Sequence, residues 1–453
     1  MKLGASGRLY GIGAIILAAL VISARSGIGS PPFLIGLAVA SIAYFLAVLE
    51  FFRTPHFPRH VIFICLALAA LWRTPFLMMP PGSDDDIHRY LWDGRLQRHG
   101  YNPYTEIPAD PAMGWLHTPE TRGMNHPELP SPYPAGAELF FRGVTSIHES
   151  VFALRIAFVV CDFAIVLLLL FDILRLSGQG EHWVLAYAWH PLLATGVAGS
   201  GHIDILGVVL LLVSVAALGR RWRTISAIAF SLAVSVKFLP IVLAPLYWRR
   251  LRGRDGVMAA LVFALLYVPF LKDGHIPGGS LGKYVHSFRF NNPLFTTLEG
   301  VASPEIIAGF AVIVGLVIAG WLRSKPTPNY SDQWAWPMAA SLAFAPVIYP
   351  WYLLWLIPFL RSTSTLPLIG WTLSILPTYT VWYLRSIGHV WIIPDWVLLL
   401  EYGSVAITAA IVALRPTANM NTRTRLNELV PASDDGLKKM GADDDHLPAR
   451  SED

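Results

Sequence analysis

The sequence predicts an all-α polytopic membrane protein, and three observations lead to that fold class. Hydrophobic residues make up 54% of the 453 residues and charged residues only 14%, and the mean hydropathy is +0.51. Apolar runs of about 20 residues, the length of a membrane-spanning helix, recur along most of the chain. Strand-like runs of alternating polarity do not occur in it, so helices must satisfy the backbone in lipid.

The apolar runs predict about ten full transmembrane helices. The first follows Lys2 and Arg8 and resembles a signal peptide, but the many spans behind it favour an uncleaved anchor. Cys65 and Cys161 both lie inside apolar runs, so no disulfide framework or cysteine metal site is predicted. The predicted spans are 9–23, 32–52, 60–79, 151–174, 182–198, 202–219, 255–271, 304–322, 366–384 and 395–414.

Two further apolar segments are interrupted and are too short for two complete spans each. Thr224–Trp248 is interrupted at Lys237–Pro240. Trp334–Leu360 is interrupted at Tyr349–Tyr352. Basic residues flank both segments, so each is predicted to form a hairpin of shortened helices that enters and leaves on one side. Broken helices at membrane depth are tolerated where they line a cavity.

Lysine and arginine residues give the predicted orientation, because cytoplasmic loops carry an excess of them. The basic loops between the spans fall on one side, which is therefore cytoplasmic. The loops 80–150 and 272–303 then face outward. The membrane domain is predicted to be 1–415, and 416–453, with few large apolar residues, a disordered cytoplasmic tail.

The first outward loop begins with the most informative feature of the chain. Three consecutive carboxylates, Asp84 to Asp86, directly follow the apolar run 61–79, although the chain has only 30 acidic residues. Carboxylates crowded beside a low-dielectric boundary repel one another, which raises the pKa of at least one and suits proton or cation binding. The plain alternative is a solvated helix N-terminus, where aspartate favours the macrodipole.

A helix is predicted to follow the carboxylates and to end at Gly100. Asp86, Tyr90 and Asp93 recur in it at three- and four-residue spacing, so they share one face. Farther along the chain come other polar and aromatic motifs. In order, the motifs are Asp85-Asp86-Ile87-His88-Arg89-Tyr90-Leu91-Trp92-Asp93-Gly94, Gly100-Tyr101-Asn102-Pro103-Tyr104, Asn125–Pro130, Tyr133-Pro134, His190–Leu193, Gly199–Asp204, Lys237–Pro240 and Tyr349–Trp355.

This ordered set resembles the membrane-embedded glycosyltransferases of the GT-C class. It is most similar to the polyprenyl-phosphate-mannose-dependent α-mannosyltransferases of bacteria and archaea. The resemblance covers about residues 60 to 360 and implies a GT-C-like bundle with a helical first outer loop. The chain departs from the pattern at His88 and His190, where the family usually has Tyr and Asn.

The outward position of the acidic loop predicts a lipid-linked donor, because no nucleotide pool exists outside the cytoplasmic membrane. The chain also lacks a Gly-rich phosphate loop. We therefore expect transfer of a hexose, mannose by the resemblance, from polyprenyl phosphate to a hydroxyl of an envelope glycan or glycolipid. Transfer needs a base for the acceptor hydroxyl and positive groups for the departing phosphate. One carboxylate base and direct displacement give inversion at the anomeric carbon.

The resemblance assigns the catalytic base to Asp86 and makes Asp85 its partner or an acceptor-binding group. Tyr90 and Asp93, on the same predicted face, are candidate substrate-binding residues. Arg89 points away from that face, and two roles stay open for it: binding a phosphate or lipid head group, or a salt bridge to a neighbouring aspartate.

The other candidate binding residues lie at span ends and breaks. His202 and Asp204 follow a Gly-Ser-Gly turn, and ionisable residues in membrane segments default to function. Lys237 would hold the donor phosphate or, as the alternative, pair with an interior aspartate, for which Asp162 is the candidate. In the second outward loop and second break, the remaining candidates are His286, Arg289, Asn291 and Tyr352.

No cofactor is predicted, although a divalent cation on Asp85 and Asp86 stays open. The expected partners are the polyprenyl-phosphate-linked sugar donor, a glycan or glycolipid acceptor and membrane lipids, without nucleic acid. The expected location is the cell membrane, with the active site on the extracytoplasmic face. A lipid or sugar transporter is the alternative from another class, because its broken helices and buried charges would look similar.

Overall fold

The computed structural model describes residues 4–80, 82, 86–271, 277–326 and 329–414. Helices of all kinds account for 74% of the structure, which confirms the predicted all-α class. The described residues form no strand, and only an isolated parallel bridge joins Phe290 to Val347. One compact unit ends at Ala409 and holds the cavity and every site below. The predicted tail, 416–453, lies outside the described residues.

Seven helices of the described chain are long and apolar enough to cross a membrane, or eight if one bent pair counts as a single span. The predicted count of ten unbroken spans is therefore not confirmed. The seven are α1 (Ala5–Ala24), α2 (Pro31–Arg53), α3 (Arg59–Leu77), α6 (Val151–Leu168) continued through η3 (Leu169–Ile173) and α7 (Leu174–Leu176), α11 (Gly253–Tyr267) continued in η7 (Val268–Phe270), α14 (Pro304–Ser324) and α18 (Asp395–Leu414).

Three predicted spans are broken or shorter than expected. The region 182–198 folds as η4 (Glu181–Trp183), α8 (Val184–Ala188) and the π-helix η5 (Leu193–Gly199). The axis then turns by 111° into α9 (Asp204–Gly219). The glycine-rich link 199–201 permits this turn, because Gly201 has a φ of +72°. The region 366–384 folds as η11 (Thr363–Thr365), α16 (Leu366–Ser374), η12 (Leu376–Tyr379) and α17 (Thr380–Ser386).

The first predicted interruption lies at Lys237, where the sequence placed it, whereas the second begins earlier than predicted, after Ala343. Helix α10 (Arg223–Val236) ends at Lys237 and is followed by the 3-10 helix η6 (Leu239–Tyr247). Helix α15 (Tyr330–Ala343) is followed by η9 (Pro350–Trp355) and η10 (Ile357–Phe359). Each of these 3-10 helices has a proline in its first two positions, where the missing backbone N–H leaves no hydrogen bond unmade.

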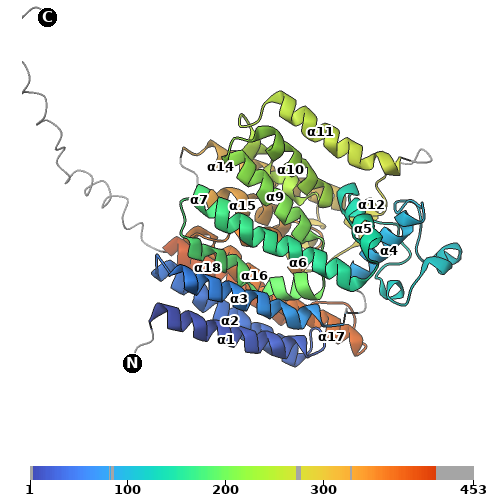
Figure 1. Cartoon of the computed structure of the whole chain (residues 1–453). Coiled ribbons are helices and arrows are strands. Elements are labelled where there is room, and N and C mark those ends of the chain that lie inside the picture. The colour runs from blue at the N-terminus through green and yellow to red at the C-terminus, as the bar shows by residue number, and fades with distance from the viewer. Residues whose placement is uncertain (1–3, 81, 83–85, 272–276, 327–328, 415–453) are drawn as a thin grey trace, which may run out of the picture. The chain divides into compact units, whose positions relative to one another are not determined.

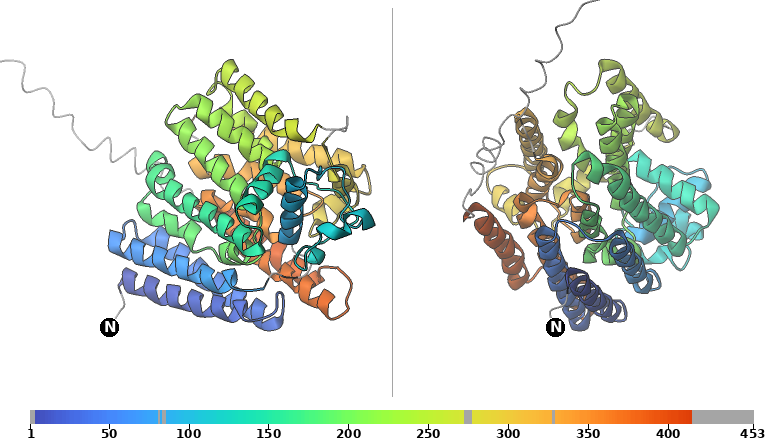
Figure 2. Two further views of the ribbon diagram at one scale, coloured as in Figure 1. Left: turned by 45° about the vertical axis from the view of Figure 1, so that its right-hand side comes forward. Right: turned by 60° about the vertical axis from the view of Figure 1, so that its left-hand side comes forward.

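The outer-loop helices gather at one end of the bundle, where α4 (Asp86–Arg98), α5 (Ala135–Ile147) and α12 (Leu281–Ser287) lie near the ends of α6, α9 and α10 (Figures 1 and 2). Helix α4 packs on α5, and Trp92 and Leu96 form a core with Met113, Leu116 and Met124. This core fixes the direction of α4 and therefore the place of Asp86. The remaining short helices are η1 (Pro111–Leu116), η2 (Thr121–Gly123) and α13 (Pro293–Leu298).

Candidate active site

A cavity of about 650 Å³ opens where the two outer loops meet the two broken hairpins. That volume suits a sugar with its phosphate, since ligand cavities commonly hold 300–1,000 Å³. Its walls come from α4, the loop before α5, the break after α10, the α12 region and the start of η9. The lining residues used below are Asp86, Arg89, Tyr90, Asn125, Glu128, Leu129, Pro130, Pro132, Tyr133, Pro134, Lys237, Phe288, Arg289, Tyr349, Trp351, Tyr352, Trp382, Arg385 and Trp391.

Asp86 is the first residue of α4, and its carboxylate is 21% exposed in this cavity. Oδ1 accepts a hydrogen bond of 2.9 Å from Nδ2 of Asn125. Oδ2 lies 3.7 Å from Nδ1 of His202, which is ion-pair range but too long for a hydrogen bond. Burial alone would raise the pKa of Asp86, but His202, Asn125 and the Lys237 charge together hold it below its ordinary value. Asp86 is thus an ionised acceptor, the state that a base requires.

Lys237 lines the same cavity as Asp86 and lies at the break after α10. Its Nζ donates a hydrogen bond of 2.8 Å to Oδ1 of Asp204, the first residue of α9. Trp355 Nε1 donates to the same oxygen at 2.7 Å. The ammonium also sits 3.4 Å from the ring centre of Tyr352, a cation–π distance. Lys237 is 25% exposed and Asp204 only 1%, so the pair is anchored inside and open toward the cavity.

The expected alternative partner of Lys237, Asp162, is engaged elsewhere. Its Oδ2 accepts from Nε of Arg73 at 2.5 Å, and its Oδ1 from the hydroxyl of Tyr187 at 2.7 Å. The Arg73 pair is fully buried between α3 and α6. Asp162 is therefore a structural ion-pair partner, and the interior aspartate that Lys237 uses is Asp204.

His202 is buried beside this ion pair, in the bend between η5 and α9. Its ring stacks on Trp351 at 3.6 Å, and Trp351 stacks in turn on Tyr349 at 4.5 Å. Within the described part of the chain, neither ring nitrogen of His202 has a hydrogen-bond partner, and Oδ2 of Asp204 has none either. Buried polar atoms are normally paired. These atoms therefore have hydrogen-bonding capacity to spare next to Asp86 and Lys237.

Asp86, Tyr90 and Asp93 were predicted to share one helix face, but in the structure only the first two line the cavity. Tyr90 lines the cavity, and its ring stacks on Phe141 at 4.4 Å. Asp93 is absent from the cavity lining and pairs with Arg89, whose Nε lies 3.0 Å from Oδ1. The salt bridge is thus the role that the structure gives Arg89, although this residue also borders the cavity. All sides of α4 are packed, so face position alone could not separate these residues.

Of the three candidate binding residues in the second outer loop, only Arg289 lines the cavity. Arg289 lines the cavity and donates to Oε1 of Glu299 through Nη2 at 2.5 Å. His286 is not among the lining residues, is 66% exposed and contacts Glu305 at 2.8 Å. Asn291 is buried outside the cavity, where Nδ2 donates to Glu401 of α18 at 3.0 Å.

Several lining residues were not predicted as site residues. Asn125 lies inside the quoted Asn-His-Pro-Glu-Leu-Pro motif, which was the available signal. Trp382, Arg385 and Trp391 come from the outer end of a predicted full span, where one arginine between tryptophans is the signal. The guanidinium of Arg385 lies 5.6 Å from the ring centre of Trp391.

A divalent cation could not be placed from the described residues. Among them, no group of three or more His, Cys, Asp or Glu side chains is arranged to hold a metal ion. Asp85, which was assigned as the partner of Asp86, lies outside the described residues. Its role stays a prediction.

A family model described as alpha-(1->6)-mannopyranosyltransferase, N-terminal domain, matches residues 13–250, just over half of the chain. The chain belongs to this mannosyltransferase family. Comparison with curated proteins and with solved structures gave no match. The matched region contains Asp86, His202, Asp204 and Lys237. Tyr352, Trp382, Arg385 and Trp391, which also line the cavity, follow it in the chain.

Family membership makes the protein a glycosyltransferase that transfers a mannosyl group. The transporter alternative is therefore set aside. The seven long apolar helices agree with a multi-pass membrane enzyme. The cavity at the end of those helices is the candidate place for the chemistry.

Proposed function

We propose that the enzyme transfers mannose from a polyprenyl-phosphate donor to a hydroxyl of an envelope glycan or glycolipid, with inversion, on the extracytoplasmic face. The observation that carries the proposal is the place of Asp86: an ionised carboxylate, held by Asn125 and His202, on the wall of a cavity that also contains Lys237. This arrangement sets a base and a cation around one space. Both are needed when a hydroxyl displaces a phosphate.

The shape and chemistry of the cavity support a lipid-linked donor. Lys237, Arg289 and Arg385 bring positive charge to its lining, which suits a phosphate. Phe288, Trp382 and Trp391 supply aromatic surface on the same lining, which suits an isoprenoid chain.

Lys237 is the cation best placed for the leaving phosphate. Its pairing with Asp204 occupies one direction, while the exposed quarter of the side chain faces the cavity. Asp204 accepts a hydrogen bond from Lys237 and is itself held by Trp355, so little ordering is needed when the donor binds.

The set of carboxylates supports direct displacement. Among the residues that the structure describes, two carboxylates line the cavity, Asp86 and Glu128. Glu128 is 58% exposed and pairs with His126, whereas the Asp86 carboxylate is only 21% exposed. A single base that takes the acceptor proton while the phosphate leaves gives inversion. A β-linked donor would then yield an α-linked product.

The test is transfer by the purified full-length enzyme in lipid nanodiscs. Labelled β-mannosyl polyprenyl phosphate and GDP-mannose are supplied separately with a membrane glycan extract, and the anomeric configuration of the product is read by NMR. We expect product only from the lipid-linked donor, with the α configuration. Product from GDP-mannose, or a β-linked product, would contradict the proposal.

A matched pair of variants ties the reaction to the cavity. Asp86→Asn keeps the shape of the side chain and removes its basicity. Asp110→Asn makes the same change at an exposed outer-loop aspartate that only caps a 3-10 turn, a role that asparagine also fills. We expect Asp110→Asn to retain full transfer and Asp86→Asn to lose it.

A further inference from the structure

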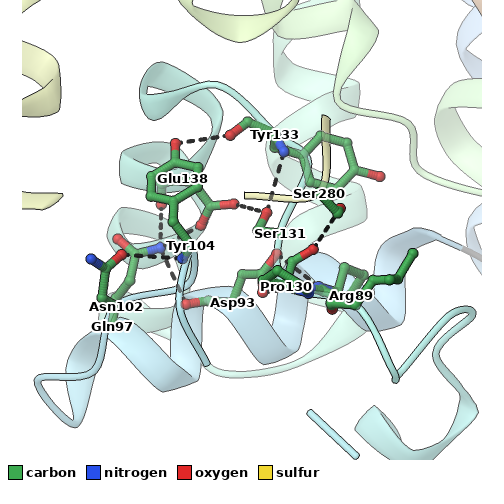
Figure 3. A network of polar contacts seen from close by, with 11 residues as sticks. Arg89, Asp93, Gln97, Asn102, Tyr104, Pro130, Ser131, Tyr133, Glu138 and Ser280 are labelled. Atoms are coloured by element: carbon green, nitrogen blue, oxygen red, sulfur yellow. Dashed lines mark hydrogen bonds and ion pairs between the residues drawn. The ribbon is translucent and has the colours of Figure 1, made fainter. Parts of the chain in front are cut away.

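A cluster of polar side chains is buried beneath one wall of the cavity, between α4 and α5 (Figure 3). Asp93 and Gln97 come from α4, Glu138 from α5, and Ser131 from the loop that joins them. Asp93, Ser131 and Glu138 are completely buried. The reaction described above uses none of the three, although burying two carboxyl groups together is costly.

The cluster contains two carboxyl groups but one cation. Arg89 Nε donates to both oxygens of Asp93, at 3.0 and 3.1 Å. Glu138 accepts from neutral groups: the Ser131 hydroxyl at 2.5 Å and Gln97 Nε2 at 2.8 Å. Within the described residues, Glu138 forms no ion pair with a basic group. A second buried negative charge beside Asp93 would be uncompensated.

The carboxyl group of Glu138 is therefore neutral. Burial first, and then the charge of Asp93, raise the pKa of Glu138 well above its ordinary value. The other titratable groups that face Glu138 are Arg89 from α4 and Tyr104 from the loop after α4, whose own pKa is raised by burial and by Glu138. The acid form of Glu138 can donate its proton to Asp93, so that one proton joins the two side chains.

The cluster holds the cavity wall formed by residues 129–134. Ser131 is the direct link, because its hydroxyl bonds to Glu138 and accepts from the backbone N–H of Tyr133 at 3.3 Å. Arg89 Nη1 donates to the carbonyl of Leu129 at 2.8 Å. On the other side, the Ser280 hydroxyl donates to the carbonyl of Pro130 at 2.8 Å. The wall is thus held by the buried cluster, by the turn at Pro103 and Tyr104, and by the second outer loop.

We propose that Glu138 is a positioning residue for mannosyl transfer, which stays protonated at neutral pH and, through Ser131, holds the 129–134 wall of the cavity in place. The proposal rests on the proposed function only in that this cavity binds the substrates. Glu138 does not touch the reacting atoms. Its effect passes through the wall that does line the cavity.

The kinetic test compares Glu138→Gln with Glu138→Ala in the full-length enzyme. A glutamine is neutral and keeps an N–H donor for Asp93, so it should leave kcat/KM close to the wild-type value. Alanine removes the link to Ser131, and the misplaced wall should lower kcat/KM about 10²-fold, chiefly through KM of donor or acceptor. A merely structural glutamate would instead reduce the folded fraction, which lowers the maximal rate at unchanged KM. That result, or equal damage from glutamine and alanine, would overturn the proposal.

If Glu138→Ala does not fold, Ser131→Ala replaces it, because this change keeps the Asp93–Glu138 pair and removes only its link to the wall. The same rise in KM is expected, and an unchanged KM would overturn the proposal. The protonation state of Glu138 is measured separately, without substrate, by infrared spectroscopy at pH 7. A neutral carboxylic acid gives a carbonyl stretching band that a carboxylate lacks. The band should be present in the wild type and lost in Glu138→Gln. If the band is absent from the difference between the wild-type and Glu138→Gln spectra, Glu138 is not protonated and the proposal is refuted. Failure of the wild-type enzyme to transfer mannose would instead count against the proposed donor.

Discussion

Removal of the Lys237 charge should destabilise the enzyme before any substrate is added. Lys237→Met keeps the apolar stem but leaves Asp204 buried with Trp355 as its remaining donor. Stranding one member of a buried ion pair costs about 3–5 kcal/mol. Because Lys237 is 25% exposed and Trp355 stays bonded to the carboxylate, we expect the lower end, about 3 kcal/mol.

The assay is a double-mutant cycle with denaturant unfolding of detergent-purified protein. Asp204→Asn in the Lys237→Met background removes the stranded charge, so the double variant should be more stable than Lys237→Met alone. Lys283→Met, at an exposed lysine of α12, is the matched control and should stay within about 0.5 kcal/mol of wild type. Additive losses in the double variant would show that the two residues do not interact and would refute the reasoning.

The affinity of the same variants for the donor separates the two roles of Lys237. If its ammonium also contacts the phosphate, donor affinity should fall in Lys237→Met and should not recover in the double variant, although stability does. Recovery of both together would mean that Lys237 serves only to neutralise Asp204.

Three further outcomes are expected. Asp86→Asn should lower single-turnover transfer at least about 10²-fold with donor binding retained, and near-normal turnover would move the base elsewhere. Because the pKa of Asp86 lies below its ordinary value, kcat/KM should stay level from neutral pH down to below the usual carboxyl range, and an earlier decline would contradict this. Glu138 keeps its proton longer when folded than when unfolded, so wild-type stability should fall as pH rises from the ordinary carboxyl pKa toward the raised one. Glu138→Gln should remove that slope in unfolding midpoints measured against pH.

The sequence predicted the breaks that coincide with polar residues and missed those inside apolar runs. At Lys237–Pro240 two sequence signals indicate an interruption: a charged residue within an apolar segment, and a proline three residues later. The mean hydropathy of segments 182–198 and 366–384 is that of an apolar membrane span. Their breaks at Pro191 and Pro377 depend on packing that a hydropathy window cannot detect.

Interaction partners that lie far away in the sequence explain why some of the site predictions failed. Asp86 could be singled out because it ends a run of three carboxylates at a predicted membrane boundary, and Lys237 because it is the one charge within its apolar segment. The choice of Asp162 as the interior aspartate failed because Arg73, 89 residues earlier, already pairs with it. The sequence pattern predicts Asn291 as a substrate-binding residue because its actual partner, Glu401, lies 110 residues farther along and cannot be recognised from the motif.

The division of the cavity between two parts of the chain has a consequence for how such enzymes can diversify. The base and the cation belong to the segment that matches the family, whereas Trp382, Arg385 and Trp391 come from the segment after residue 250. Under the proposed function, substitutions of Trp382, Arg385 and Trp391 should change which lipid carrier is held, whereas Tyr352 and Trp355 of the same segment contact Lys237 and Asp204 and must be kept. An exchange of the part after residue 250 between related enzymes should therefore carry donor preference with it, while the linkage made by the base-bearing part is inherited unchanged.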